Sequence, residues 1–245
     1  MLYDVSKRAQ VVALLAPMPS ELRPLVRMLS LRRSTVDGMA VREGTLGAAR
    51  VVATRTGMGT ERARRVTEQV VETLAPRHVV VVGVAGGVGE GLAVGDVVVP
   101  EEVVDHATAM VFRAHPLGNM ELRGRIFTTD DLLVDPSERA RALPPDVDAL
   151  DMETSAVADV CQQHGVPWTA VRSLSDHVDG DLVDDAVFGL AHPDGSPNVA
   201  AIGRYVATRP WKIPRLARLG RDLRTATHAA AREAVGACRE HDWDE

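Results

Sequence analysis

The sequence predicts an α/β fold with a mainly parallel or mixed central sheet. Apolar residues make up 45% of the 245-residue chain, yet aromatic residues make up only 3%. The core must therefore be built from Val, Leu and Ala side chains, which is typical of sheets buried on both faces. The four valines within 78–82 indicate one such strand, and apolar residues recur with helical spacing just before it, within 60–74.

Strand and helix patterns alternate along the chain. They predict strands at 10–16, 39–43, 49–56, 78–82, 94–100 and 168–174. They predict helices from a cap at Ser20 to Met28, at 60–74, at 151–164 and over most of the last forty residues. The glycine-rich segment 83–89, the weakly patterned 105–119 and much of 179–198 are expected to be loops.

The chain is expected to form a single domain over residues 1–245. This length suits one large α/β domain, and we find no convincing linker, although 209–212 marks a C-terminal helical segment that begins at about 208. In that segment, arginines recur nearly on one face, at 215, 218, 221 and 224. We interpret them as a solvated helix face rather than a phosphate site.

The composition of the chain indicates which partners and which cellular location to expect. The net charge of −6 gives no broad attraction to nucleic acid or to an anionic membrane. The longest uncharged apolar run, 79–88, is too short for a bilayer, so no membrane span is expected. Cys161 and Cys238 fit neither a metal motif nor a disulfide framework, which favours a cytoplasmic location.

Polar residues and glycines follow several predicted strands, at the edge where open α/β sheets bind ligands. They are Glu21, the Gly57-x-Gly59 turn, the segment 83–89, Glu153 and Asp176. Each has a purely structural alternative that remains open. Carboxylates favour the first turn of a helix, Ser-Asp pairs suit caps, and glycines suit tight turns. A functional interpretation therefore needs the whole set.

Other kinds of site are not indicated. The segment 83–89 lacks the Gly-Lys-Ser/Thr ending of a phosphate-binding loop, and a strand follows it where a dinucleotide site needs a helix. The eight histidines show no ligand spacing such as HExxH. No Gly-x-Ser-x-Gly elbow occurs, which argues against a serine hydrolase. We expect neither a metal nor a cofactor.

Six segments form a recognisable ordered set. They are Val-Ala-Leu-Leu-Ala-Pro-Met-Pro-Ser-Glu at 12–21, Thr-Gly-Met-Gly at 56–59, Val-Gly-Val-Ala-Gly-Gly at 82–87, Val-Gly-Asp-Val-Val at 94–98, Leu-Asp-Met-Glu-Thr at 150–154 and Val-Arg-Ser-Leu-Ser-Asp at 171–176. Together they resemble the nucleoside phosphorylase superfamily, most closely its 5′-methylthioadenosine/S-adenosylhomocysteine nucleosidase branch. The resemblance implies a three-layer α/β/α fold with a twisted, mixed and partly barrel-like sheet.

The resemblance also implies roles for residues. Asp176 matches the acid that protonates or hydrogen-bonds N7 of the purine, and Glu21 matches the carboxylate that activates water. Such help lowers the barrier because the purine leaves poorly as an anion and the sugar becomes cationic. The expected substrate-binding residues are Glu153 and Met152 at the ribose, Met58 in the sugar pocket, and Val84, Ala85, Gly86, Leu132 and Leu133 near the ligand or the base.

Two departures from the family bear on the substrate. Val84 stands where methylthioadenosine nucleosidases usually carry a serine, and Leu132 and Leu133 fall near the usual Phe-Ile pair around the base. The 83–87 loop and the tail 209–220 are similar to the hopanoid-associated phosphorylase-like branch. The resemblance therefore includes bulky or lipid-linked adenosyl nucleosides among the candidate substrates.

The leading hypothesis is hydrolysis of an adenosine-derived purine nucleoside by a homodimer or higher homo-oligomer, as the resemblance implies. The first alternative is phosphorolysis, with phosphate held by Arg23, Arg55 or a neighbouring subunit. Segment 16–20 lacks the Gly-Asp-Pro-x-Arg pattern of hexameric phosphorylases, which favours water. The second alternative is a non-catalytic nucleoside-binding protein.

Overall fold

The computed structural model describes residues 10–89, 91–131, 141–144, 146–177, 192, 196 and 198–243. Its strands are β1 (Val11–Ala16), β2 (Arg32–Val36), β3 (Met39–Leu46), β4 (Ala49–Arg55), β5 (His78–Gly87), β6 (Val97–Val98), β7 (Glu102–Asp105), β8 (Val111–Arg113), β9 (Arg125–Thr128), β10 (Ala149–Asp151) and β11 (Trp168–His177). Its helical elements are α1 (Pro19–Met28), α2 (Thr60–Leu74), α4 (Thr154–Gln163), α6 (Val199–Thr208), the 3-10 turn η2 (Pro210–Lys212) and α7 (Ile213–Glu240). None of these helices is long and apolar enough to cross a membrane.

All of these strands belong to one mixed sheet of 11 strands. The main path runs β2-β3-β4-β1-β5-β10-β9-β7-β8, and β11 pairs with β5 and β6 beside that path. The centre is parallel, with β1 between β4 and β5 and with β11 along β5. β2, β3 and β4 form an antiparallel meander at one edge. The predicted mixed sheet is confirmed, and among the described strands it stays open between β2 and β8.

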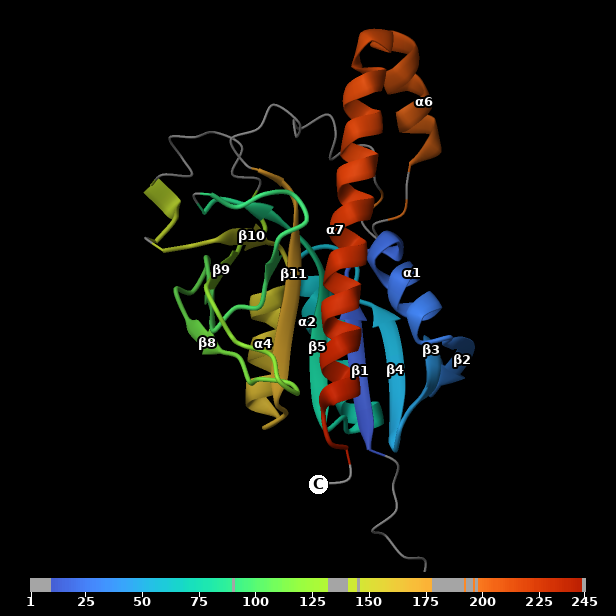
Figure 1. The fold of residues 1–245 in the computed structure, drawn as a ribbon, viewed down its shortest axis with the longest axis vertical. Coiled ribbons are helices and arrows are strands. Elements are labelled where there is room, and N and C mark those ends of the chain that lie inside the picture. The colour runs from blue at the N-terminus through green and yellow to red at the C-terminus, as the bar shows by residue number, and fades with distance from the viewer. Residues whose placement is uncertain are drawn as a thin grey trace, which may run out of the picture.

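Helices cover both faces of the sheet, which confirms the predicted three-layer fold (Figure 1). Along β1, odd-numbered side chains pack in the core cluster that includes α2 and α4. Even-numbered side chains of β1 pack in the cluster that includes α1 and α7. Successive strand residues point to opposite faces, so this fully buried strand joins both cores. Val, Leu and Ala dominate the two clusters, as the low aromatic content predicted.

The sheet divides at β5, and this division creates room for a site. β1 pairs with β5 only as far as Val81, whereas β10 pairs with β5 at Gly86 and Gly87. β11 follows the other edge of β5 from Val79 to Gly87. β1 and β10 thus pair with the same edge of β5. Between them, residues 82–85 have no partner on that edge among the described strands. Their backbone groups on that edge need other hydrogen-bonding partners.

The structure corrects several predicted boundaries. Strand β5 continues to Gly87, so most of the predicted loop 83–89 is strand, because β11 pairs along it. Helix α1 begins at Pro19, so Ser20 lies in its first turn instead of capping it. Asp151 ends strand β10, and the helix predicted from 151 begins only at Thr154.

Other corrections concern short strands. β2 was not predicted, and β7 and β8 occupy part of a region expected to be loop. The predicted strand 94–100 is reduced to β6. Each of these elements spans five residues or fewer and is held by pairing with another strand, which is the next or preceding strand for β2 and β8 and lies farther along the chain for β6 and β7. A periodic pattern is too brief at that length to reveal them.

Helix α7 has two unlike halves. Its first buried residue is Ala226, and the part from there onward packs against β11, β5 and α1. Residues 213–225 instead extend beyond the sheet together with α6 and η2 (Figure 1). We call α6, η2 and residues 213–225 the C-terminal hairpin. The helical segment predicted from about 208 thus contains a packed helix and one arm of this projecting hairpin.

Candidate active site

Glu21 lies at the division of the sheet. It occupies the first turn of α1, shortly after β1 ends. Its carboxylate accepts hydrogen bonds from the backbone N–H of Met18 at 2.6 Å and of Val84 at 2.8 Å. Val84 belongs to the stretch of β5 without a strand partner on that side, so the carboxylate satisfies a donor that pairing would otherwise satisfy. Glu21 is only 2% exposed.

A fully buried arginine connects the acidic groups of this region. The Arg172 guanidinium, on β11, donates to the carboxylate of Asp151 and to Oε2 of Glu153, the latter at 3.2 Å. It also donates to Oγ1 of Thr154 at 3.0 Å and to the carbonyl of Val84 at 3.4 Å. Arg172 was not among the predicted site residues. The available signal was a charged side chain within an otherwise buried strand.

Glu153 joins this cluster to the Gly57-x-Gly59 turn. Its Oε1 accepts a hydrogen bond from the backbone N–H of Gly59 at 3.1 Å. Gly57 and Gly59 have φ values of 81° and 91°, a region that favours glycine. The predicted turn is confirmed, and it also presents an amide to a carboxylate. Met58 and Met152, next to these residues in the chain, are half-buried.

Burial perturbs the acid–base properties of the cluster. It raises the pKa of Glu21 to about 7, although the charge of Arg172 and the bonds from Val84 and Met18 lower it in part. Burial likewise raises the pKa of Glu153, against the opposing charge of Arg172. Burial alone would lower the pKa of Arg172, but the nearby carboxylates raise it above its usual value. Glu21 can therefore exchange a proton near neutral pH.

Gly83 lets Glu21 and Arg172 approach each other across β5. A Cβ atom on Gly83 would lie 2.5 Å from Oε1 of Glu21 and would also clash with Nη1 of Arg172. No real Cβ makes such a contact, so either the carboxylate or the guanidinium would have to move. The glycine is required by close approach, since positive φ is not involved.

Asp176 lies near the end of β11, beside the same part of β5. The register shifts between Leu174 and Asp176, and Asp176 then pairs with Gly86. The Ser175 hydroxyl donates to Oδ1 of Asp176 at 2.6 Å. The bulge shows that Ser175-Asp176 is neither a helix cap nor a simple turn. Asp176 is half-buried and therefore partly open to solvent, unlike Glu21.

The remaining predicted residues differ in how the structure places them. Val84 is half-buried and holds Glu21 through its N–H, while Ala85 is 4% exposed within β5. Gly86 pairs with β10 on one edge and with β11 on the other. Leu132 and Leu133 lie outside the described residues. The structure thus brings Glu21, Glu153 and Val84 together around Arg172. Asp176 lies farther along β11, where it pairs with Gly86 of β5.

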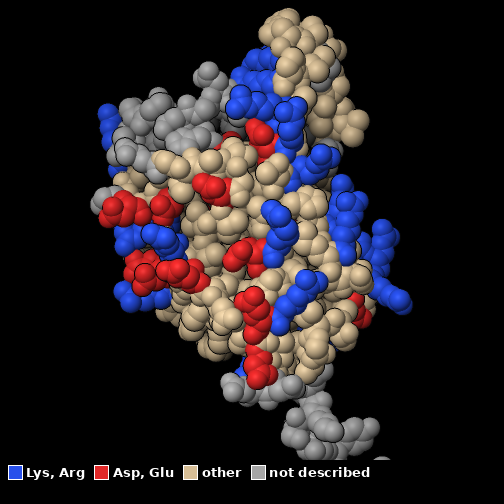
Figure 2. Space-filling view, viewed as in Figure 1, with Lys and Arg blue, Asp and Glu red and all other residues tan. Residues whose placement is uncertain are grey.

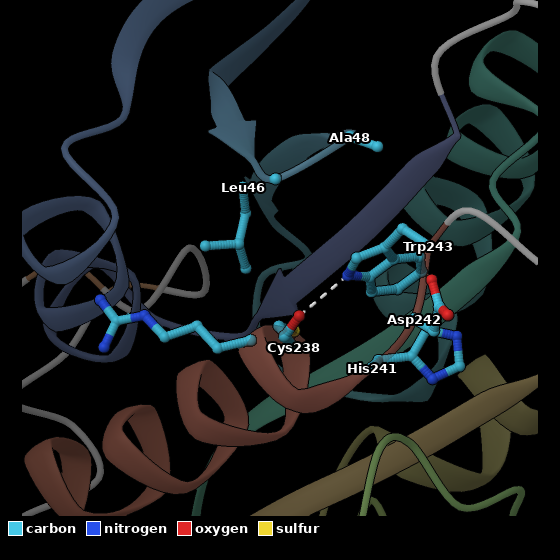
Figure 3. Close-up of a pocket in the computed structure, with 8 residues that line it drawn as sticks. Leu46, Ala48, Cys238, His241, Asp242 and Trp243 are labelled. Atoms are coloured by element: carbon cyan, nitrogen blue, oxygen red, sulfur yellow. Dashed lines mark hydrogen bonds between the residues drawn. The ribbon is translucent and has the colours of Figure 1, made fainter.

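A pocket of about 180 Å³ lies away from this cluster, beside the β3–β4 turn and the end of α7 (Figure 3). The residues lining it are Leu46, Gly47, Ala48, Cys238, Arg239, His241, Asp242 and Trp243. The Trp243 indole donates to the carbonyl of Cys238 at 2.8 Å, and both residues pack in the core cluster between α7 and the sheet. None of the predicted site residues lines this pocket, and we assign it no catalytic role.

Comparison with known proteins shows the family to which the chain belongs. The family model described as "Phosphorylase superfamily" matches residues 11–121 and 115–206. A 5′-methylthioadenosine/S-adenosylhomocysteine nucleosidase of Shewanella putrefaciens is 30% identical over 201 residues, which cover 69% of this chain and 87% of the relative.

Solved structures match nearly the whole fold. Futalosine hydrolase of Helicobacter pylori aligns with a TM-score of 0.70 and 16% identity, over 95% of this chain and 98% of that protein. The Neisseria meningitidis nucleosidase in complex with methylthio-immucillin-A aligns with a TM-score of 0.70 and 21% identity, over 94% and 99%. The sequence match covers most of the chain and includes the segments that hold Glu21, Glu153 and Asp176, so the chain belongs to the phosphorylase superfamily.

Proposed function

We propose that this chain hydrolyses the N-glycosidic bond of an adenosine-derived purine nucleoside. The observation that carries the proposal is the buried group of carboxylates around Arg172, at the point where the sheet divides. Glu21 and Glu153 are each oriented there by a backbone N–H from a different loop or strand. When they are ionised, carboxylates held in fixed positions stabilise a sugar that becomes cationic in the transition state. The nucleosidase relatives support the same reaction class.

Asp176 serves as the acid for the leaving base. As the C1′–N9 bond breaks, its electron pair moves into the purine, and Asp176 gives a proton to N7. The base then departs neutral, a form of help worth roughly 10²–10⁴-fold in rate. The Ser175 hydroxyl donates to Oδ1 of Asp176 and helps to orient the carboxyl group.

Glu21 serves as the base for water. It lies at the cluster, and a pKa near 7 lets it accept the proton that water loses on bonding to C1′. Glu153 binds the ribose hydroxyls and fixes the sugar above Glu21. The products are free adenine and the corresponding ribose derivative, and the net proton count balances because one proton reaches the base while another leaves water.

The charge around Arg172 favours water over phosphate as the nucleophile. Arg172 is already hydrogen-bonded to Asp151 and Glu153, and Glu21 lies close to it as well. A phosphate dianion placed there would meet these carboxylates at short range. Arg23 and Arg55, the alternative phosphate ligands, are both exposed. Phosphorolysis therefore remains the second candidate.

The reaction is tested by incubation with adenosine, methylthioadenosine and S-adenosylhomocysteine, with and without phosphate. We expect adenine release at equal rates in both buffers, with a free ribose derivative as the second product. Formation of ribose 1-phosphate, or a strict need for phosphate, would establish phosphorolysis instead. Tight nucleoside binding without release of base from any of them would favour the non-catalytic alternative.

The family resemblance further leads us to propose a cytoplasmic enzyme that forms a homodimer. Closed twofold assemblies are the commonest oligomers of soluble enzymes. Light scattering coupled to size exclusion tests this proposal directly. A mass of about twice the 26.3 kDa of one chain is expected, and a mass of one chain at micromolar concentration would contradict it.

A further inference from the structure

The C-terminal hairpin exposes large apolar side chains. Val199 at the start of α6 is 77% exposed, Trp211 in η2 is 72% exposed and Ile213 at the start of α7 is 47% exposed. Only three other large apolar residues are exposed among those that the structure describes. Trp211 and Ile213 lie together at the η2–α7 junction, the tip of an element that projects beyond the sheet (Figure 1). Exposed apolar side chains grouped in this way indicate a surface that binds another molecule or a membrane.

The same hairpin carries a concentrated positive charge. Residues 199–225 contain seven basic side chains and one acidic one, in a chain whose net charge is −6. On α7 the arginines recur at every third position from 215 to 224. Figure 2 shows basic side chains gathered along the upper part of α7. The chain is therefore strongly polarised, although its net charge alone indicates no attraction to anionic surfaces.

Contacts within the hairpin stabilise both ends of α6. The Asn198 side chain caps α6 by accepting from the N–H of Ala201 at 3.0 Å. The Arg209 guanidinium and the Lys212 ammonium lie 5.2 and 5.8 Å from the centre of the Tyr205 ring. These cation–π contacts bring two cations to the Tyr205 ring, close to Trp211 in the chain.

We propose that the C-terminal hairpin docks on an anionic lipid bilayer, with Trp211 and Ile213 in the interface and the arginines on the headgroups. A bilayer surface places negative charge directly above an apolar layer, which matches cations around an apolar tip. Tryptophan also favours this interface. Nucleic acid would offer no apolar layer. Two hairpins facing each other across a twofold axis would bring like charges together.

Docking would also orient the enzyme. The hairpin extends from the end of the sheet at which β5 and β11 terminate, and Asp176 lies at that end (Figure 1). The end of the sheet that carries Asp176 would therefore face the bilayer. This proposal does not depend on the catalytic roles proposed above, since membrane binding is measured without substrate.

The test is co-sedimentation of the full chain with vesicles of phosphatidylcholine alone or with about one third phosphatidylglycerol. We expect binding only to the anionic vesicles, and weaker binding as salt increases. Trp168 and Trp243 are 1% and 5% exposed, so the third tryptophan, Trp211, is the one that can enter the bilayer. Its emission should shift to shorter wavelength and be quenched by brominated lipid. Trp211→Phe should remove both signals.

Matched variants separate this hairpin from general electrostatics. Arg218→Ala/Arg221→Ala should weaken anionic-vesicle binding by roughly fivefold for each basic side chain removed. Arg32→Ala/Arg33→Ala removes the same charge from two exposed positions on β2 and should leave binding nearly unchanged. The proposal is overturned by absence of vesicle binding at low salt, by equal effects of the two double variants, or by unchanged Trp211 emission. It is equally overturned if Trp211→Ala disrupts a dimer instead.

Discussion

The two ends of strand β5 bury titratable groups in opposite ways. At its start, His78 is 5% exposed, its Nε2 lies 2.7 Å from Oγ1 of Thr169, and burial lowers its pKa to about 3. Near its other end, Glu21 and Glu153 surround the charged Arg172. The first end holds one neutral group, whereas the second end pairs the buried charge of Arg172 with Asp151, beside two carboxyl groups whose pKa values burial raises.

This difference separates stability from function. A neutral, hydrogen-bonded histidine is an inexpensive buried polar group. Buried charges cost several kcal/mol of desolvation each and rarely add net stability even when they are paired. Their concentration at the division of the sheet therefore points to a chemical role. Variants at the two ends should accordingly affect different quantities.

The largest effect is expected from Glu21→Gln. The amide cannot take a proton from water, so kcat should fall by roughly 10²–10⁴-fold. The acid limb of the wild-type pH–rate profile, near the pKa of about 7 for Glu21, should disappear. Glu43→Gln is the matched control, since Glu43 forms a partly exposed ion pair with Arg50 on the meander. Equal rates for the two variants would remove Glu21 from the mechanism.

Arg172→Met should produce the largest loss of stability. It leaves buried carboxylates without their counter-charge, which costs about 3–5 kcal/mol. The control is Arg64→Met, which removes a pair with Asp159 in which the arginine side chain is 42% exposed. That pair should contribute about 1 kcal/mol or less. Urea unfolding measures both values, and a similar small loss in the two variants would contradict the buried-charge argument.

Gly83→Ala should lower kcat/KM by roughly 10²-fold. The new Cβ would displace Glu21 or Arg172, and a misplacement of about 1 Å can have that effect on catalysis. Gly203→Ala is a suitable control, because a Cβ there meets nothing within 4 Å. Steady-state kinetics on both proteins provide the measurement. Full activity in Gly83→Ala would mean that the cluster tolerates rearrangement.

The smallest effects, taken per pH unit, are opposite pH dependences of stability at the two ends. His78 binds a proton near 6.5 when unfolded and near 3 when folded, so its contribution is lost as pH falls between these values. Glu21 has a folded pKa of about 7 against 4.5 unfolded, so stability declines as pH rises between them. Each slope approaches roughly 1.4 kcal/mol per pH unit.

Comparing the unfolding free energies of His78→Gln and Glu21→Gln with wild type across pH isolates these slopes. The difference for His78→Gln should change on the acid side, and the difference for Glu21→Gln should change between pH 4.5 and 7. Parallel curves for wild type and either variant would show that the group in question is not perturbed by burial.

Long periodic elements and ordered motifs were predictable from the sequence. Helix 60–74 and the buried valine strand follow from local patterns, and the family follows from six short segments. The division of β5 was not predictable, because it depends on where β1 ends and β10 joins. Arg172 was missed for the same reason. Its role depends on Asp151 and Glu153, which only the folded chain brings to it.

The most direct test of the account is the rate of adenine release by Asp176→Asn, with His78→Gln as the variant at the opposite end. We predict that Asp176→Asn loses turnover while it still binds adenine and unfolds at a normal urea concentration. His78→Gln should keep its kcat and lose only stability. Unchanged turnover in Asp176→Asn would contradict the assignment of the chemistry to this end of the sheet.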